Sequence, residues 1–551
     1  MEDKLPKQAD VLIAGAGAGG AAAAWALARR GATVVLIDAG PGFDPADYKN
    51  SVDDWETQWF PIRPGSQGHH EVVAGQPLFE KWSEIRNISA PRQRMSTATQ
   101  RKSRGYSHIR GIGGTTLHFT GWMHRLRPQA FEMNTRFGVA ADWPVKYDEL
   151  ERYYALAEYM VGVAGPDQVA GRPRSAPFPT PAHPASMLSQ AIARGAEKVG
   201  LSMVQNPVAA PSQAWLGRPP CNYCGCCHKG CERGDKGSAD LTFVVPAKAT
   251  GKCGVFPRHT LVELQRGDND QITGATILDA AGDRHTITAS NYVLAAGAVE
   301  TPRLLLATDG LGNESGEVGK NFMETVGSGS TGMLPEQIGS HRGYPEDSIC
   351  WDINAPDAID GIPGGAVICP TVVSSDYHGP ARYATKLAEG IGSDFKRKLA
   401  EDFGKAAGIT VICENLPNPR SYVDLSPNQI DYTGLPIARI HSFLPDLEIE
   451  RLAYAVKKSE EILFAAGVPA ILDRFTSYEA FYASHVMGTC RMGSNPETSV
   501  VNEHQRSHRW KNLWVSDASV FPSSGSGEGP SLTLHALSIR MADKMLEQSK
   551  V

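Results

Sequence analysis

The sequence lacks an apolar run long enough to cross a membrane, because its most apolar stretch, Val11–Ala28, is interrupted by glycines. It also lacks an excess of one charge: 54 Lys and Arg stand against 60 Asp and Glu, so the formal net charge is −6 with both signs mixed. We find no internal repeat and no secretory signal, since Met1–Lys7 is polar and carries both signs. We therefore expect no nucleic-acid partner and no direct insertion into a membrane.

A strand, a glycine-rich turn, a helix and a second strand are predicted between Ala9 and Gly40. The glycines have the G-x-G-x-x-G spacing, which permits a tight turn and lets backbone N–H groups approach a pyrophosphate at the start of the helix. Asp38 ends the second strand, 23 residues after Gly15, where a carboxylate binds the ribose of a dinucleotide. The pattern predicts a dinucleotide site, either NAD or FAD, that contains Gly15, Gly17, Gly19, Gly20, Asp38 and Ala39.

Five of the ten cysteines lie within eleven residues, whereas the others are scattered. A disulfide scaffold spreads its cysteines along the chain, so this cluster suggests a metal site. Cys221, Cys224, Cys227 and Cys231 have the spacing C-x2-C-x2-C-x3-C, which holds iron–sulfur clusters in bacterial ferredoxins. Four thiolates also form structural zinc sites, usually as two separated pairs, and zinc, unligated cysteines or a disulfide remain alternatives at this point. We expect Cys226 to lie beside the ligands.

Two more motifs lie in the first half of the chain and near its middle. The segment Arg110–His124 opens with glycines that allow a close backbone approach, and it includes His118. From its spacing alone, His118 is better explained as a packing histidine than as a ligand. Farther on, Tyr292–Gly297 is predicted to be a buried strand that ends in glycine, followed by a helix that opens at Glu300.

The C-terminal region is also dense in motifs. Ser484–Gly493 reads S-H-V-M-G-T-C-R-M-G, and Asp517-Ala518 follows a short apolar strand. A final helix is predicted to begin at Pro530 after several glycines, so its free N–H groups would point toward an anionic group.

Together these segments resemble the glucose–methanol–choline (GMC) oxidoreductases, almost from end to end. The resemblance rests on the N-terminal turn, Arg110–Arg127, Trp143-Pro144 with the helix that follows, Ala295–Gly297, the H-x-x-G-T-C-R-M-G motif from His485, Asp517–Ser519 and the P-x-x-T motif from Pro530. It implies FAD as the dinucleotide and oxidation of an alcohol by hydride transfer to flavin N5. It also implies an α/β fold in which a Rossmann-like FAD-binding domain is interleaved with an antiparallel-sheet substrate domain.

The resemblance assigns roles to individual residues. His485 matches the active-site histidine of the family, which helps to remove the alcohol proton, a role that suits imidazole. The second active-site group, usually His or Asn directly before P-x-x-T, is here Gly529. Either Glu528 or another polar group supplies that contact, or one histidine suffices.

His118 falls at the position that is bonded covalently to the flavin in pyranose oxidase and choline oxidase, so the resemblance makes it a candidate for such a bond. The other residues that the resemblance places at the cofactor are Gly113, Gly114, Thr115, Phe119, Thr120, Gly297, Asp517, Ala518, Pro530 and Thr533.

The cysteine run resembles the branch of FAD-dependent sugar and glycoside dehydrogenases that contains glucoside 3-dehydrogenase and the gluconate and fructose dehydrogenase large subunits. In that branch the cysteines bind an iron–sulfur cluster with three irons (3Fe-4S), which takes electrons from the flavin. The first expectation is thus a dehydrogenase that oxidises a sugar or glycoside hydroxyl and delivers electrons to an external carrier. The alternatives are an oxidase that uses O2, a dehydrogenase of aromatic or other alcohols, or a redox-neutral lyase, with the cysteines holding a structural metal.

The expected partners and compartment follow from the cluster and the missing signal. We expect an electron-accepting carrier, with a small subunit and a cytochrome subunit as further candidates. The compartment is the cytoplasm, or the periplasm through co-export with a signal-bearing small subunit. The expected segments are 1–135 (first FAD-binding segment), 136–215 (substrate or cap segment), 216–235 (cysteine-rich iron–sulfur loop), 236–330 (second FAD-binding segment), 331–480 (substrate-binding domain) and 481–551 (third FAD-binding segment, with the catalytic motif).

Overall fold

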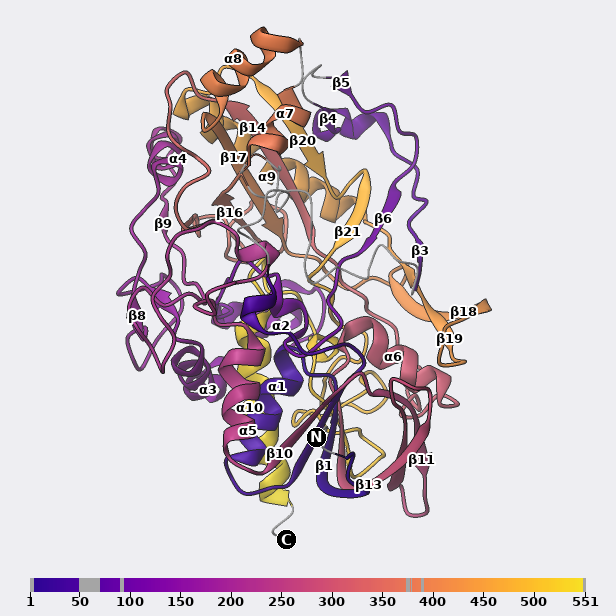
Figure 1. Ribbon diagram of the computed structural model, residues 1–551. Helices are drawn as coiled ribbons and strands as arrows, with labels where there is room; N and C mark the ends of the chain where they lie inside the picture. The colour runs from indigo at the N-terminus through magenta and orange to yellow at the C-terminus, as the bar shows by residue number, and fades with distance from the viewer. Residues whose placement is uncertain are drawn as a thin grey trace.

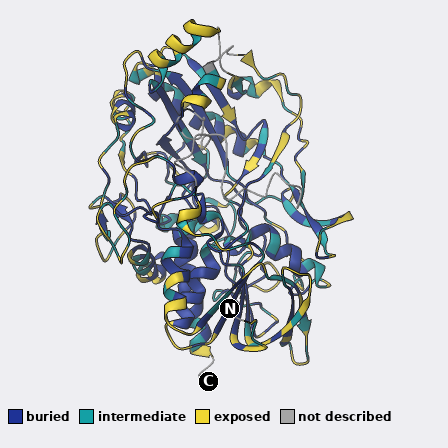
Figure 2. Ribbon diagram, viewed as in Figure 1, coloured by how far each residue is buried: buried dark blue, intermediate teal, exposed yellow. Residues whose placement is uncertain are grey.

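The computed structural model describes residues 4–48, 70–89, 94–372, 377, 379–387 and 391–548. Two large sheets organise these residues, one in the lower half of Figure 1 and one in the upper half. In Figure 2 the strands of both sheets are mostly buried, whereas the outlying helix α8 (Gly392–Asp402) is exposed. None of the helices in the described residues is both long and apolar enough to cross a membrane.

The lower sheet has the strand order β10-β2-β1-β13-β12-β11, and β22 pairs with β13. Strands β10, β2, β1, β13 and β22 run parallel to their neighbours, while β11 and β12 complete the sheet as an antiparallel extension. Its strands therefore come from the N-terminus, the middle and the C-terminal region of the chain. Their bounds are β1 (Gln8–Ala14), β2 (Val34–Asp38), β10 (Cys253–Pro257), β11 (Thr260–Arg266), β12 (Ile272–Leu278), β13 (Arg284–Leu294) and β22 (Leu513–Val515).

Helix α1 is the helix predicted after the glycine turn, and it packs against the C-terminal helix α10. Its alanine-rich surface is almost entirely buried, because small side chains allow the two helices and the sheet to approach closely. Helix α3 covers the other side of α10. The helices of this half are α1 (Ala18–Ala28), α2 (Met133–Phe137), α3 (Tyr147–Val161), α5 (Val245–Ala249), α6 (Gly297–Ala307) and α10 (Ser531–Gln548).

The upper sheet has the order β16-β17-β14-β20-β4-β5, and its neighbouring strands are antiparallel. The long helix α9 packs on β14 and β17, and α4 packs on α9. The elements of this half are β4 (Ile88–Ser89), β5 (Arg94–Met95), α4 (Met187–Lys198), β14 (Val326–Met333), β16 (Ala366–Pro370), α7 (Pro380–Leu387), α8, β17 (Ala406–Cys413), α9 (Asp446–Ala466) and β20 (Ile471–Thr476). A parallel Rossmann-like sheet joined to an antiparallel sheet is the architecture expected from the sequence.

Small sheets connect distant parts of the chain. In Figure 1, β3 lies beside β19 and β6 beside β21, so segments between residues 70 and 106 pair with segments beyond residue 430. The predicted segment boundaries remain predictions. The bounds are β3 (His70–Val73), β6 (Lys102–Tyr106), β7 (Ala164–Gly165), β8 (Thr180–Pro181), β9 (Val204–Gln205), β15 (Ser348–Ile349), β18 (Tyr422–Ile430), β19 (Pro436–His441) and β21 (Ala480–Ala483).

One helix begins earlier than the sequence predicts. Helix α6 starts at Gly297 instead of Glu300, which leaves Pro302 inside it. The reason is a contact from far along the chain: Asp517 Oδ2 accepts the Gly297 N–H at 2.9 Å and thereby stabilises the helix start. A local reading of the sequence has no access to this contact.

Candidate functional site

A cavity of about 970 Å3 lies between the carboxyl ends of the parallel strands and the upper sheet. Most of the predicted site residues line it, although they come from seven separate stretches of the chain. These are Gly15, Gly17, Gly19, Asp38, Ala39, Gly114, Thr115, His118, Phe119, Thr120, Gly297, His485, Asp517, Ala518, Gly529 and Pro530. The predicted residues Gly20, Gly113, Glu528 and Thr533 and the four predicted cysteine ligands are not among the lining residues.

The glycines of the first turn have different constraints. A Cβ at Gly15 would lie 2.2 Å from Ala295 O, and one at Gly20 would lie 1.9 Å from Gly15 O, so the fold itself requires both glycines. A Cβ at Gly17 would have no neighbour closer than Gly114 Cα, at 3.9 Å, and Gly17 faces the cavity. This space at the N-terminus of α1 fits the pyrophosphate of a dinucleotide.

Asp38 holds the turn together. Its carboxylate accepts the backbone N–H groups of Ala16 and Gly40, both at 2.8 Å. Burial raises the pKa of Asp38, and these hydrogen bonds oppose that shift. Because Asp38 also lines the cavity, its predicted contact with the ribose is compatible with this arrangement and remains a prediction.

The second glycine motif packs directly on the first. Gly113 and Gly114 both have left-handed φ angles, +100° and +53°, and a Cβ at Gly114 would lie 2.7 Å from Gly17 Cα. A short 3-10 helix, Gly114–Leu117, follows and places His118 in the cavity wall with only 2% of its surface exposed. The predicted covalent bond at His118 is compatible with this position and remains untested.

Another buried histidine in the wall was missed by the sequence reasoning. Neither ring nitrogen of His108 has a hydrogen-bond partner among the described residues, and the ring stacks on Tyr106 at 4.5 Å. A buried histidine without a partner is costly, so a ligand with acceptor oxygens, such as a pyrophosphate or a ribityl chain, fits this wall. The one feature of the sequence that could have pointed to His108 is its position two residues before Arg110, where the glycine-rich segment begins.

His485 lies on the loop after β21 and is half-buried in the cavity. Its backbone N–H donates to Thr325 Oγ1 at 2.9 Å, which fixes the loop. Burial lowers the pKa of His485 to about 4, so its imidazole is neutral at neutral pH. A neutral imidazole is able to accept a proton from a hydroxyl group bound in the cavity.

Gly529 is tied to a histidine that the sequence reasoning did not single out. The Gly529 N–H donates to Nδ1 of His124 at 3.2 Å, and His124 Nε2 lies 2.7 Å from Asn206 Oδ1. The first contact requires Nδ1 to be the acceptor, so Nε2 carries the proton. Burial lowers the pKa of His124 to about 3. Both nitrogens of this neutral ring are therefore engaged by the protein.

Glu528 forms a buried ion pair with Arg172, whose Nη2 lies 2.6 Å from Glu528 Oε1. The Arg172 guanidinium also stacks on Trp351, 3.8 Å from the ring centroid, and donates to Asn354. Burial lowers the pKa of Arg172 to about 10, which leaves it charged at neutral pH. The side chain of Glu528 is thus paired with an arginine, and its predicted catalytic contact with the substrate stays a prediction.

The last two predicted residues connect elements. Asp517 accepts the hydroxyl group of Thr301 as well as the Gly297 N–H, so it joins the C-terminal segment to the start of α6. Thr533 is fully buried in α10 and shares a hydrogen bond of 2.9 Å with the Tyr154 hydroxyl group. Thr533 therefore supports the helix behind Pro530.

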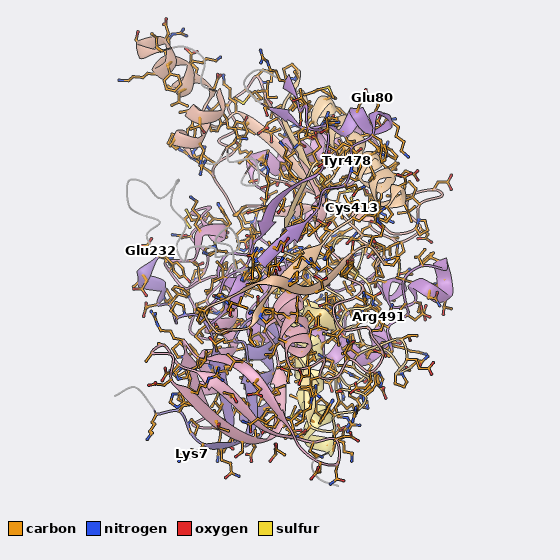
Figure 3. All side chains as sticks on the ribbon, turned by 90° about the vertical axis from the view of Figure 1, so that its right-hand side faces the viewer. Lys7, Glu80, Glu232, Cys413, Tyr478 and Arg491 are labelled. Carbon is orange, nitrogen blue, oxygen red and sulfur yellow. The ribbon has the colours of Figure 1, made fainter. Side chains whose placement is uncertain are left out.

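The cysteine-rich loop lies against the cavity. His228, within the loop, lines the cavity, and the fully buried Lys236 donates from Nζ to Cys227 O at 2.6 Å, Leu117 O at 2.9 Å and Phe119 O at 3.0 Å. Lys236 thus joins the loop to the segment that carries His118. Figure 3 shows Glu232, the residue after the last cysteine of the loop, at the edge of the molecule.

None of the ten cysteines, all of which lie in described residues, forms a disulfide. In the loop, burial raises the pKa of Cys221, Cys227 and Cys231. Neighbouring thiolates add to that shift for Cys221 and Cys227, and Asp235 adds to it for Cys231. Within the described ranges, no three His, Cys, Asp or Glu side chains gather as a metal site. The donor set has the chemistry of an iron–sulfur ligand set, and the positions of the side chains do not by themselves indicate a cluster.

Comparison with protein families finds two GMC oxidoreductase models, which match residues 78–326 and 417–538, and a model of an NAD(P)-binding Rossmann-like domain, which matches residues 13–73. The chain is 27% identical to the fructose dehydrogenase large subunit of Gluconobacter japonicus, covering 98% of both chains. It is also 27% identical to the paromamine 6'-oxidase of Streptomyces fradiae, covering 97% of this chain and 90% of that one.

Among solved structures, pyridoxine 4-oxidase from Mesorbium loti superposes with a TM-score of 0.65 at 18% identity, covering 98% of this chain and 99% of that chain. This likeness supports the fold. The family matches, the dinucleotide turn and the histidine in the cavity agree with one another: the chain belongs to the GMC oxidoreductase family of FAD-dependent enzymes that oxidise alcohols and sugars.

Proposed function

We propose that this enzyme is a dehydrogenase that oxidises a hydroxyl group of a sugar or glycoside and passes the electrons through a 3Fe-4S cluster to an external carrier. The observation that carries the proposal is a short route from cavity to surface. His228 lines the cavity, and the exposed Glu232 follows four residues later on the same loop. Bound FAD would supply the hydride acceptor, flavin N5.

His485 is the proposed proton acceptor. Its neutral imidazole takes the hydroxyl proton of the substrate while the hydrogen on the same carbon leaves as hydride. At position 529 the chain has a glycine where the family usually has a second histidine or an asparagine, and a Cβ there would lie only 3.0 Å from Trp122 Cβ. His485 is therefore proposed to accept the proton alone. The buried ring of His124 holds the turn at Gly529.

Cys221, Cys224, Cys227 and Cys231 are the proposed ligands of the cluster. What supports this assignment is their spacing together with Lys236, which fixes Cys227 to the backbone of Leu117 and Phe119 beside His118. A cluster held by these cysteines would accept electrons one at a time, which would require the loop to lie near the flavin site. The relatives named as dehydrogenases favour this electron exit.

The same relatives suggest partners. One of them is a large subunit by name, so we propose a small subunit, and a cytochrome subunit or soluble carrier as the electron acceptor. The compartment is then the cytoplasm, or the periplasm if a signal-bearing small subunit carries the chain across. Detection of this chain in the cytoplasm alone, together with its co-expressed partner, would remove the periplasmic alternative.

A second candidate function is an oxidase that returns the electrons to O2, with the cysteines holding a structural metal. It is favoured by relatives such as paromamine 6'-oxidase. The two candidates differ in what the cysteine loop does, so a single set of variants separates them.

The experiment compares Cys224→Ser with a matched control, Cys253→Ser, a buried cysteine on β10 outside the loop. We expect Cys224→Ser to lose iron and the electron paramagnetic resonance signal of a cluster, while alcohol still reduces the flavin under nitrogen and electron delivery to cytochrome c or a quinone analogue collapses. Cys253→Ser should keep all of these. Flavin content and the melting temperature control for misfolding.

Two outcomes contradict the proposal. If the purified wild-type enzyme, prepared without oxygen, contains zinc and no iron, the cysteines hold a structural metal, and the oxidase becomes the better supported function. If a folded, iron-free variant still delivers electrons at the full rate, the cluster is not the exit.

A further inference from the structure

Glu346 is a buried carboxylate in the cavity wall that no motif of the sequence indicated. It lines the same cavity as His485 and is only 7% exposed. Its backbone has a φ of +60°, which is rare for a residue with a side chain and persists only where surrounding contacts hold it. The fold therefore keeps this side chain where it is at a conformational cost.

The contacts of Glu346 tie it to the predicted flavin and active-site segments. Its Oε2 accepts the hydroxyl group of Thr120 at 2.6 Å, two residues after His118. Its backbone carbonyl accepts from Asn206 Nδ2 at 2.9 Å, and Asn206 in turn holds His124. Through these bonds Glu346 is positioned relative to both the His118 segment and Gly529.

Glu346 differs from the other buried glutamates in its charge environment. Glu158, Glu324, Glu448, Glu479 and Glu528 each have an arginine within 3 Å. Glu414 instead accepts several backbone N–H groups from residues 524–526. Glu346 has no ion pair with any residue that the structure describes. Burial raises its pKa, and side-chain hydrogen bonds from Thr120, Trp122 and Thr371 oppose that shift.

None of these donors carries a positive charge, so they compensate the buried carboxylate only in part, and Glu346 faces the ligand cavity. The proton of a substrate hydroxyl group would supply the missing compensation, because a hydrogen bond to a charged acceptor is stronger than one between neutral groups. A simple alcohol has only the hydroxyl group that is oxidised. A sugar or diol has a second one to offer.

We propose that Glu346 determines substrate specificity by accepting a hydrogen bond from a second hydroxyl group of the substrate, next to the carbon that is oxidised. This inference rests on the proposed function and refines it. The preferred substrates are vicinal diols and polyols, and mono-alcohols of equal size are disfavoured. His485 remains the proton acceptor, and Glu346 sets which alcohol is held in front of it.

The test compares pairs of alcohols that differ by one hydroxyl group. Anaerobic flavin reduction is followed with 2-methyl-1,2-propanediol and 2-methyl-1-propanol. Binding alone is measured by calorimetry with pinacol and 2,3-dimethyl-2-butanol, whose tertiary carbinol carbons have no hydrogen to transfer. The variants are Glu346→Gln, which keeps the shape, and Glu346→Ala, with the exposed Glu263→Gln as a matched control.

We expect both Glu346 variants to lose about 10–100-fold in kcat/KM for the diol, mainly through KM, with little change for the mono-alcohol. The Kd of pinacol should rise by a similar factor, and that of 2,3-dimethyl-2-butanol should stay unchanged. Glu263→Gln should match the wild type throughout. Melting temperature and flavin content show whether each variant is folded, and Glu346→Gln keeps the test valid if Glu346→Ala is not.

Different failures point to different conclusions. If diol and mono-alcohol are affected equally in a folded variant, or if pinacol binds unchanged, the proposal for Glu346 is wrong and the proposed function stands. If no alcohol or sugar of a broad panel reduces the wild-type flavin, the proposed function fails, and the specificity role fails with it.

Discussion

The Gly529 N–H donates to Nδ1 of His124 across 3.2 Å, which joins the turn before α10 to a histidine from the His118 segment. His124, the second histidine near the proposed active site, thus accepts a hydrogen bond from the backbone through one ring nitrogen, and its other ring nitrogen is hydrogen-bonded to Asn206. His485 is left as the proton acceptor.

Replacement of His485 by Ala should slow anaerobic flavin reduction by alcohol ~10²–10⁴-fold, because general-base catalysis contributes about that much. The lowered pKa of His485 also predicts how the rate of flavin reduction depends on pH. Since burial lowers the pKa of His485 to about 4, the neutral base persists well below pH 6.5. In the wild type the reduction rate should therefore fall only as pH drops through about 4–5. A rate that halves near pH 6.5 would contradict the assignment, provided that stopped-flow traces and flavin content show intact enzyme.

Gly17→Val should abolish FAD binding while the protein stays folded, because the added side chain enters the cavity where the pyrophosphate is expected. Gly20→Ala is the contrasting variant, since its Cβ would meet Gly15 O at 1.9 Å and should disrupt the fold itself. Flavin absorbance and circular dichroism measure the two effects. Normal flavin content in the Gly17→Val variant would show that FAD does not bind at this turn.

A covalent bond at His118 would keep the yellow colour in the pellet after acid precipitation. His118→Ala should then release all FAD to the supernatant, with the flavin still bound before the acid is added. Mass spectrometry of the tryptic peptide that contains residue 118 gives a second reading. Complete release of FAD from the wild type would leave His118 as a neighbour of the ring only.

Glu528→Gln should lower the free energy of unfolding by about 3 kcal/mol, because it removes the charge that compensates the buried Arg172. Flavin reduction should change only a few-fold. The double variant with Arg172→Met should recover part of the lost stability, as expected for two residues in direct contact. A large loss of flavin reduction with unchanged urea midpoints would instead assign Glu528 a catalytic contact.

His535 should make the protein sensitive to acid. Its ring is fully buried in α10 without hydrogen-bond partners in the described part of the chain, and burial lowers its pKa to about 3. Between pH 6.5 and 3, His535 is protonated in the unfolded chain and neutral in the folded protein, so the free energy of unfolding falls as pH falls. At pH 5 this amounts to about 2 kcal/mol.

His535→Phe should remove that part of the pH dependence, whereas His285→Phe, at a more exposed site, serves as the control. Urea midpoints measured between pH 7 and 5 check both. Identical slopes for wild type and His535→Phe would mean that the buried ring is protonated without penalty.

The glycine turn, the first helix and the parallel strands follow from local pattern, because each depends on residues within about thirty positions. The motifs at His118 and His485 were recognisable because the family repeats them. Three residues that support the site carry no local signal: Asn206, Arg172 and Glu346. Their partners His124, Glu528 and Thr120 lie 82, 356 and 226 positions away along the chain. The start of α6 was misplaced for the same reason, since its cap comes from Asp517.

The order of the lower sheet has a consequence for synthesis. Strand β1 leaves the ribosome first, yet β22 joins the same sheet and α10 covers α1. At translation rates of about 5–20 residues per second, the first strand waits ~25–100 s for these partners. During that time the apolar alanine surface of α1 is uncovered and the flavin cradle is open. We expect the nascent chain to depend on chaperones and to acquire FAD only after the last helix has been made.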